Sequence, residues 1–214
     1  MPPYLRTILT ILFSLWAVAW GESLQAAKNS SQPADSVVVA VLGSGYQTVT
    51  YKGSMEVFGK HFSGLYFFKQ MGEDKKRMVV LSEFGLNLLD FQFSADSAQL
   101  MNAQDFLNKP GLIELLKGDF GFLVRGLQAS DVVKYRLQPN AKDVALTKIK
   151  TDNGRFTLYH RVTDGRLVKV KQRQNWFSSV IYAFAYQDSH LPEEILIRHT
   201  GIPFKMKLKK IKEE

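Results

Sequence analysis

Histidines and carboxylates are the first residues to consider for chemistry, because they supply most general acids, general bases and metal ligands in proteins. The four histidines lack a short spacing, such as H-x-x-x-H, that would place two of them on one metal ion. We interpret each as an ordinary surface or strand residue: His61, His160, His190 and His199. Four carboxylates have the right chemistry for an acid–base pair, but nothing in their spacing brings two of them together: Glu83, Asp90, Asp119 and Asp188.

Other catalytic patterns are missing as well. The sequence has no cysteine, which excludes disulfides, thiolate metal sites and thiol nucleophiles. It has no G-x-S-x-G elbow, no P-loop and no dinucleotide fingerprint, and Gly43-Ser44-Gly45 is a turn without the continuation that a phosphate loop needs. We therefore predict a protein that is not an enzyme and that uses no cofactor and no metal.

Residues 1–27 have the pattern of a secretory signal peptide. Arg6 supplies a positive charge, and an apolar run from Ile8 to Trp20 follows that is short for a transmembrane helix. Small residues allow cleavage near Gly21 or Ala27. An uncleaved N-terminal anchor is the alternative interpretation.

The rest of the chain is predicted to form one domain. We expect residues 28–35 to be a flexible polar leader, residues 36–214 to be a single folded domain, and the protein to be periplasmic. Because there is no cysteine, there is no lipobox, and the chain is not itself lipidated at an N-terminal cysteine.

From Tyr46 onward, apolar and polar residues alternate with period two, which is typical of half-buried strands. Turn signals recur along the chain, so the pattern predicts a mainly β meander of about ten strands and disfavours a βαβ nucleotide-binding fold. The expected strands are 46–57, 61–71, 77–84, 86–93, 132–138, 143–150, 155–163, 166–174, 178–187, 193–200 and 203–211. Asp164-Gly165 predicts a hairpin with a type I′ turn. Residues 37–42 remain open between a short helix and a strand.

One segment, Pro110 to Leu127, has helical spacing instead. Apolar residues recur every three or four positions, Asn108 is a candidate N-cap, and Pro110 suits the first turn. Gly118 and Gly121 each weaken a helix by about 1 kcal/mol relative to alanine. The helix is either an ordinary cover for the sheet or a lid that moves off a cavity.

Two kinds of strand face indicate what the protein could bind. The formal net charge is +8, and cations alternate with apolar residues in two late strands, at Lys169, Lys171, Arg173, Lys205, Lys207 and Lys209. Such lysines either protect exposed strands from aggregation or meet an anionic membrane surface or an acidic envelope protein. These lysine faces carry few aromatic residues, so we do not expect nucleic-acid binding. In contrast, segments 61–71 and 178–187 are apolar on both faces and need cover on both sides.

Short motifs resemble a known family. They are Tyr51-Lys52-Gly53 through Phe62-Ser63-Gly64, Ser82-Glu83-Phe84-Gly85, Leu89-Asp90-Phe91, Asp119-Phe120 and Leu191-Pro192-Glu193-Glu194-Ile195. With an export signal, a meander interrupted by one helix, and a last strand of alternating lysines, the chain resembles the LolA/LolB-like superfamily of periplasmic lipoprotein carriers and receptors. More narrowly, it is similar to a group of uncharacterised exported proteins with that fold.

The resemblance implies a fold and a ligand. The fold would be an unclosed antiparallel β half-barrel with a helical lid, and the hollow under the lid would hold the acyl chains of a lipoprotein or lipid. The residues that the resemblance assigns to the hollow are Phe62, Tyr66, Phe68, Phe91, Phe93, Leu112, Leu116, Phe120, Tyr182 and Phe184. The alternative function is that of a non-catalytic structural or accessory protein in a cell-envelope complex. No polar residue that latches the lid can be assigned from the sequence.

Overall fold

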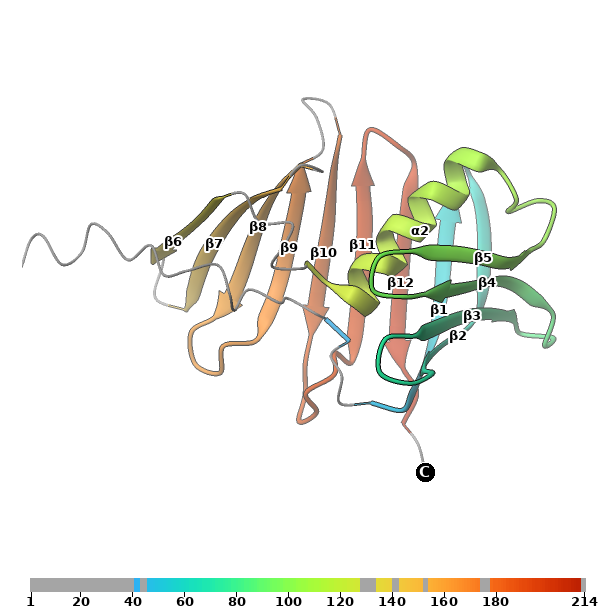
Figure 1. Ribbon diagram of the computed structural model, residues 1–214, viewed down its shortest axis with the longest axis horizontal. Helices are drawn as coiled ribbons and strands as arrows, with labels where there is room; N and C mark the ends of the chain where they lie inside the picture. The colour runs from blue at the N-terminus through green and yellow to red at the C-terminus, as the bar shows by residue number, and fades with distance from the viewer. Residues whose placement is uncertain are drawn as a thin grey trace, which may run out of the picture. The chain divides into compact units, whose positions relative to one another are not determined.

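The computed structural model describes residues 41–42, 46–127, 134–139, 143–151, 154–173 and 178–212, all within one compact unit, Ala34–Glu214. The predicted signal peptide, the leader and most of residues 37–42 lie outside the described residues. The described part is mainly β, with one antiparallel sheet and a helix across it (Figure 1). The strands are β1 Thr48–Val57, β2 Lys60–Gln70, β3 Lys76–Ser82, β4 Asn87–Phe93, β5 Ala98–Ala103, β6 Lys134–Pro139, β7 Val144–Thr151, β8 Gly154–Arg161, β9 Leu167–Arg173, β10 Ser179–Ala185, β11 Glu194–Thr200 and β12 Phe204–Lys210.

The sheet contains twelve strands in the order β5-β4-β3-β2-β1-β12-β11-β10-β9-β8-β7-β6. Two meanders, β1 to β5 and β6 to β12, are therefore joined where the first strand pairs with the last. The outermost strands, β5 and β6, do not pair with each other, so the sheet is unclosed. The prediction of an unclosed antiparallel half-barrel with a helix is confirmed.

Strand β5 was not predicted from the sequence. Its sequence, AQLMNA, lacks regular alternation of apolar and polar residues, and none of its side chains is fully buried. As an edge strand it has a pairing partner on one side only, so burial imposes little pattern on it.

The turn between β8 and β9 differs from the predicted type. The two strands do form a hairpin, but Asp164 does not have the positive φ that a type I′ turn needs. Only Gly165 does, at 68°, and its amide donates to the carbonyl of Arg161 across a longer turn. A two-residue turn with positive φ at both positions occurs instead at Phe58 and Gly59, where φ is 48° and 77°.

Helix α2, Pro110–Arg125, confirms the predicted helical segment. Its N-cap is Lys109, with no side-chain cap, so the expected capping role of Asn108 is wrong; Pro110 does occupy the first turn. The helix ends at Gly126, which has a positive φ of 71°. We call the face of the sheet that contacts α2 the inner face.

Candidate functional site

The inner face collects nearly all the residues that the resemblance assigns to a hollow. Nine of the ten are buried, and Phe62 is partly buried. Alternation within β2, β4 and β10 places them on the same side as α2, and contacts between aromatic rings join the helix to the sheet. Within β2, Tyr66 and Phe68 lie on the inner face, whereas Leu65 and Phe67 lie on the alternate face.

Aromatic side chains of α2 contact both meanders. The Phe120 ring lies 6.3 Å from the ring centroids of both Tyr66 and Phe68, and 6.4 Å from that of Phe91. On the other side, the Phe122 ring lies 4.4 Å from that of Tyr182 and 6.3 Å from that of Phe156. One helix therefore joins β2 and β4 to β8 and β10 through apolar contacts.

Close to Phe120, little empty space remains between α2 and the sheet. The cavity next to Phe120, lined by the side chains of Met55, Phe62, Tyr66 and neighbouring residues, has a volume of about 10 Å³. This is the room for a single water molecule. In this region the side chains of the sheet therefore pack directly against α2, and a molecule larger than water fits there only if α2 or these side chains move.

A polar cluster lies within this apolar layer. Asp119 of α2 accepts a hydrogen bond of 2.9 Å from the Tyr182 hydroxyl through Oδ1, and its Oδ2 lies 2.8 Å from Nε2 of His199. All three side chains are at most 8% exposed. We call these residues the Asp119 cluster. It attaches the middle of the helix to β10 and β11.

Burial raises the pKa of two members of this cluster, Asp119 and Tyr182. Desolvation raises the pKa of Asp119, because the low-dielectric surroundings disfavour the carboxylate, while the contacts with His199 and Tyr182 oppose that shift. Burial, together with the nearby Asp119, raises the pKa of Tyr182 well above its usual value. Tyr182 is therefore a hydrogen-bond donor at any physiological pH.

The sequence contained a signal for this cluster that spacing between carboxylates does not reveal. Asp119 lies three residues after Leu116 and four before Leu123, on the apolar stripe of the helix. His199 continues the inward alternation of Ile195 and Ile197 in β11. A carboxylate on one apolar stripe and a histidine on another are expected to meet where the stripes pack, since buried charged groups need partners.

Two further contacts hold the C-terminal end of α2. The Lys76 ammonium donates to the carbonyl of Val124, and burial lowers the pKa of Lys76. The Arg125 guanidinium lies 5.6 Å from the centre of the Phe93 ring. Positive side chains at a helix C-terminus interact favourably with its exposed carbonyls and dipole.

At the other end of the helix, one ring pair lies beside the small cavity. Phe62, at the start of β2, stacks on Phe106 of the segment between β5 and α2, with ring centroids 5.2 Å apart. Phe106 is 43% exposed, whereas Phe62 also lines the cavity. This pair therefore lies between the inner face and solvent.

The predicted basic strands differ in their surroundings. Cations of β12 are accompanied by carboxylates: Lys207 forms an ion pair with Glu194, and Lys205 is opposite Glu56 in the register with β1. The two strands next to β9, which are β8 and β10, contain no Asp or Glu in their sequences. Neither strand is an edge strand, so protection of exposed edges does not explain their lysines.

The described residues contain no group of three or more His, Asp or Glu placed to hold a metal ion. No helix in the described part of the chain is long and apolar enough to cross a membrane.

No family model and no curated protein matches this sequence. Solved structures do match it. A LolA superfamily protein from Nitrosomonas europaea gives a TM-score of 0.48 at 8% identity, over 77% of this chain and 83% of that one. A DUF1329 family protein from Desulfovibrio piger gives 0.47 at 9%, over 78% and 85%.

A domain described as an outer membrane lipoprotein-sorting protein, from Vibrio parahaemolyticus, gives a TM-score of 0.49 at 6% identity, over 79% of this chain and 85% of that one. The superfamily that the sequence resembles is thus also named among the matched structures. Every one of these TM-scores is below 0.5, so the function of this chain has to be inferred from its own residues.

Proposed function

We propose that this protein is a periplasmic, non-catalytic carrier that binds the acyl chains of a lipoprotein or lipid on its inner face, after α2 has moved away. The observation that supports this most is the construction of the inner face. A continuous layer of buried aromatic and aliphatic side chains is covered by one helix, whose middle is attached through a single polar cluster. The glycine at position 118 also keeps that helix easy to distort.

The energetics support an exchange of helix for lipid. An acyl chain of about 15 methylenes gains roughly 12 kcal/mol on leaving water. The hydrogen bonds of the Asp119 cluster contribute only a few kcal/mol in total, so they do not prevent exchange. The apolar side of α2 needs a new partner once it moves, and the lipid tails or a transfer partner would supply it.

The second candidate is a structural or accessory protein of a cell-envelope complex. The observation that favours it is the close packing next to Phe120, where the cavity has a volume of only about 10 Å³. In that case α2 is a permanent part of the core, and the protein acts through its outer surface.

Native mass spectrometry separates the two candidates. The purified chain is mixed with a diacylated lipopeptide, and with the same peptide lacking acyl chains as a control. A carrier forms a one-to-one complex with the lipopeptide alone. An accessory protein stays unliganded with both, and that result would overturn the proposal.

A matched pair of variants tests the position of the ligand. Phe62→Asp places a charge beside the cavity, whereas Phe84→Asp places the same charge on a turn where the native side chain is 98% exposed. We expect the first variant to lose the lipopeptide complex and the second to keep it. Equal binding by two folded variants would exclude the inner face near Phe62 as the binding surface.

A further inference from the structure

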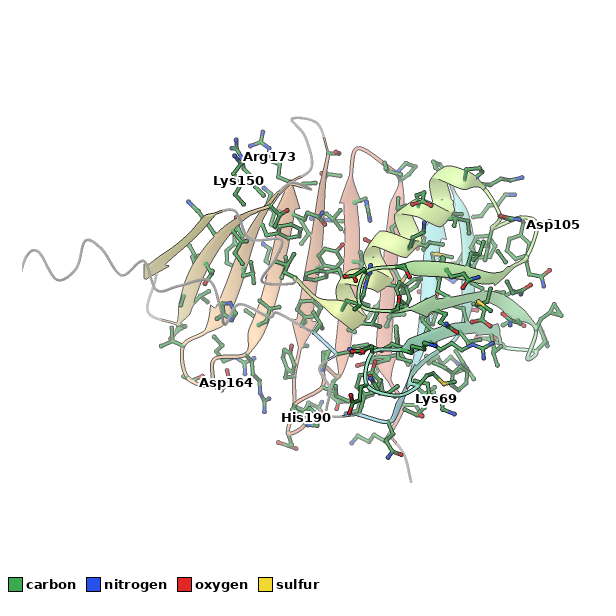
Figure 2. All side chains as sticks on the ribbon, viewed as in Figure 1. Lys69, Asp105, Lys150, Asp164, Arg173 and His190 are labelled. Carbon is green, nitrogen blue, oxygen red and sulfur yellow. The ribbon has the colours of Figure 1, made fainter. Side chains whose placement is uncertain are left out.

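Cations form two rows on the outer face of three adjacent strands. The register of β7, β8 and β9 places Lys148 opposite Thr157 and Thr157 opposite Lys171, and it aligns Lys150, Arg155 and Arg173 in the next row. All five cationic side chains are exposed, and they line one surface depression. Figure 2 shows Lys150 and Arg173 at the same end of these strands. We call these five residues the cationic rows: Lys148, Lys150, Arg155, Lys171 and Arg173.

The described strands β6, β7, β8, β9 and β10 contain no aspartate and no glutamate. Opposing residues in neighbouring strands have Cβ atoms about 5 Å apart, and like charges at that distance destabilise a sheet. The neighbouring cations Lys150 and Arg155 therefore repel each other across the β7–β8 pair.

Two ordinary explanations for exposed lysines do not apply here. The edge strand is β6, and β7 to β9 are the second to fourth strands from that edge, so β8 and β9 do not need protection from edge-to-edge pairing. If the cations only reflected the general positive charge of the protein, carboxylates would lie among them. This is the case around β12, where Glu194 and Glu56 lie next to the lysines. The concentration of exposed cations on β7 to β9, whose own sequences contain no Asp or Glu, is thus a local feature.

We propose that the outer face of β7 to β9 docks on an anionic phospholipid surface through the cationic rows. Clusters of lysine and arginine are attracted to anionic leaflets, and each such residue strengthens binding about fivefold near the surface. Tyr159 lies among them, with the Lys169 ammonium 5.2 Å from the centre of its ring. Tyrosine is enriched at membrane interfaces, because it has an apolar body and a polar end.

The composition favours a lipid surface over an acidic protein. Lysine is depleted from protein–protein interfaces, whereas three of the five members of the cationic rows are lysines. This docking surface is on the opposite side of the sheet from the inner face, and its test does not depend on acyl-chain binding.

Vesicle sedimentation with matched variants tests the proposal. The full chain is mixed with phosphatidylcholine vesicles and with vesicles in which one lipid in three is phosphatidylglycerol. One variant carries Lys148→Gln, Lys150→Gln and Lys171→Gln. Its control carries Lys205→Gln, Lys207→Gln and Lys209→Gln, which removes the same charge from β12.

We expect the wild-type chain to bind only the anionic vesicles and to be released by salt, because ions screen exposed charges. The β7 to β9 variant should bind about a hundredfold more weakly, and the β12 variant should lose far less. The β7 to β9 variant should also be at least as stable as the wild type, since like-charge repulsion is removed. Equal losses in both variants, or no binding of the wild type to anionic vesicles, would overturn the proposal. So would tighter binding to soluble polyglutamate than to vesicles, which would point to an acidic protein.

Discussion

Replacing Tyr182 by phenylalanine removes the hydroxyl that donates to Asp119 and leaves the aromatic ring in place. The buried Oδ1 atom of Asp119 then loses that donor, which costs about 2 kcal/mol. For a chain of this size, a loss of 1 kcal/mol lowers Tm by roughly 2–4 °C, so we expect a decrease of about 4–8 °C. Tyr51→Phe is the matched control, because it removes a buried hydroxyl that donates to the backbone carbonyl of Pro192, away from α2.

The two variants should differ more in ligand binding than in stability. If the Asp119 cluster holds α2 closed, then weakening it by about 2 kcal/mol raises the open population up to about 30-fold. The apparent affinity for a fluorescent fatty acid should rise by up to the same factor in Tyr182→Phe and stay unchanged in Tyr51→Phe. Thermal unfolding by circular dichroism and a fluorescence titration measure the two quantities. Weaker binding by Tyr182→Phe, or the same affinity in both variants, would refute the assignment of the cluster as the attachment of a lid.

Three other predictions concern single positions. In Gly118→Ala the new Cβ meets no atom within 4 Å, and the substitution should stabilise α2 by about 1 kcal/mol. Uptake of a fluorescent fatty acid, measured by stopped flow, should therefore slow. Faster uptake would contradict the proposal that α2 moves. Burial raises the pKa of Asp119 in the folded state above its unfolded pKa of 3.8. The protonated carboxyl therefore contributes its full stabilisation below pH 3.8, and this stabilisation is lost as the pH rises through the folded-state pKa. In urea unfolding, Asp119→Asn should therefore gain stability relative to the wild type as the pH rises. A variant that loses stability relative to the wild type as the pH rises would contradict the raised pKa. Phe58, 67% exposed at a φ of 48°, should be replaceable by asparagine with a gain of about 1 kcal/mol, and a loss on thermal unfolding would show that its ring is needed.

Much of the fold was predictable from the sequence, because one buried face imposes period two on a strand. That rule predicted eleven of the twelve strands, and it failed at β5, where an edge position leaves AQLMNA without alternation. The helix was predictable from its spacing and Pro110, but its N-cap was not, because Lys109 takes that position with no capping side chain.

The candidate site was only partly predictable. The aromatic residues of the inner face follow from alternation and from the family resemblance, whereas the way α2 fills the space between them depends on side-chain packing. The Asp119 cluster joins residues 63 and 80 positions apart, so no local spacing brings them together. The cationic rows likewise became visible only when the register aligned Lys150, Arg155 and Arg173 across three strands.

Hydrogen exchange of the α2 amides gives a direct test of the proposal that lipid takes the place of this helix on the inner face. Exchange is measured by mass spectrometry on the free chain and on the chain saturated with a diacylated lipopeptide, with the amides of β1 and β12 as an internal reference. We expect lipopeptide to lower the protection of Leu112 to Val124 and to leave β1 and β12 protected, because the sheet persists while the helix leaves it. Unchanged or increased protection of α2 in the lipid-bound chain would contradict it.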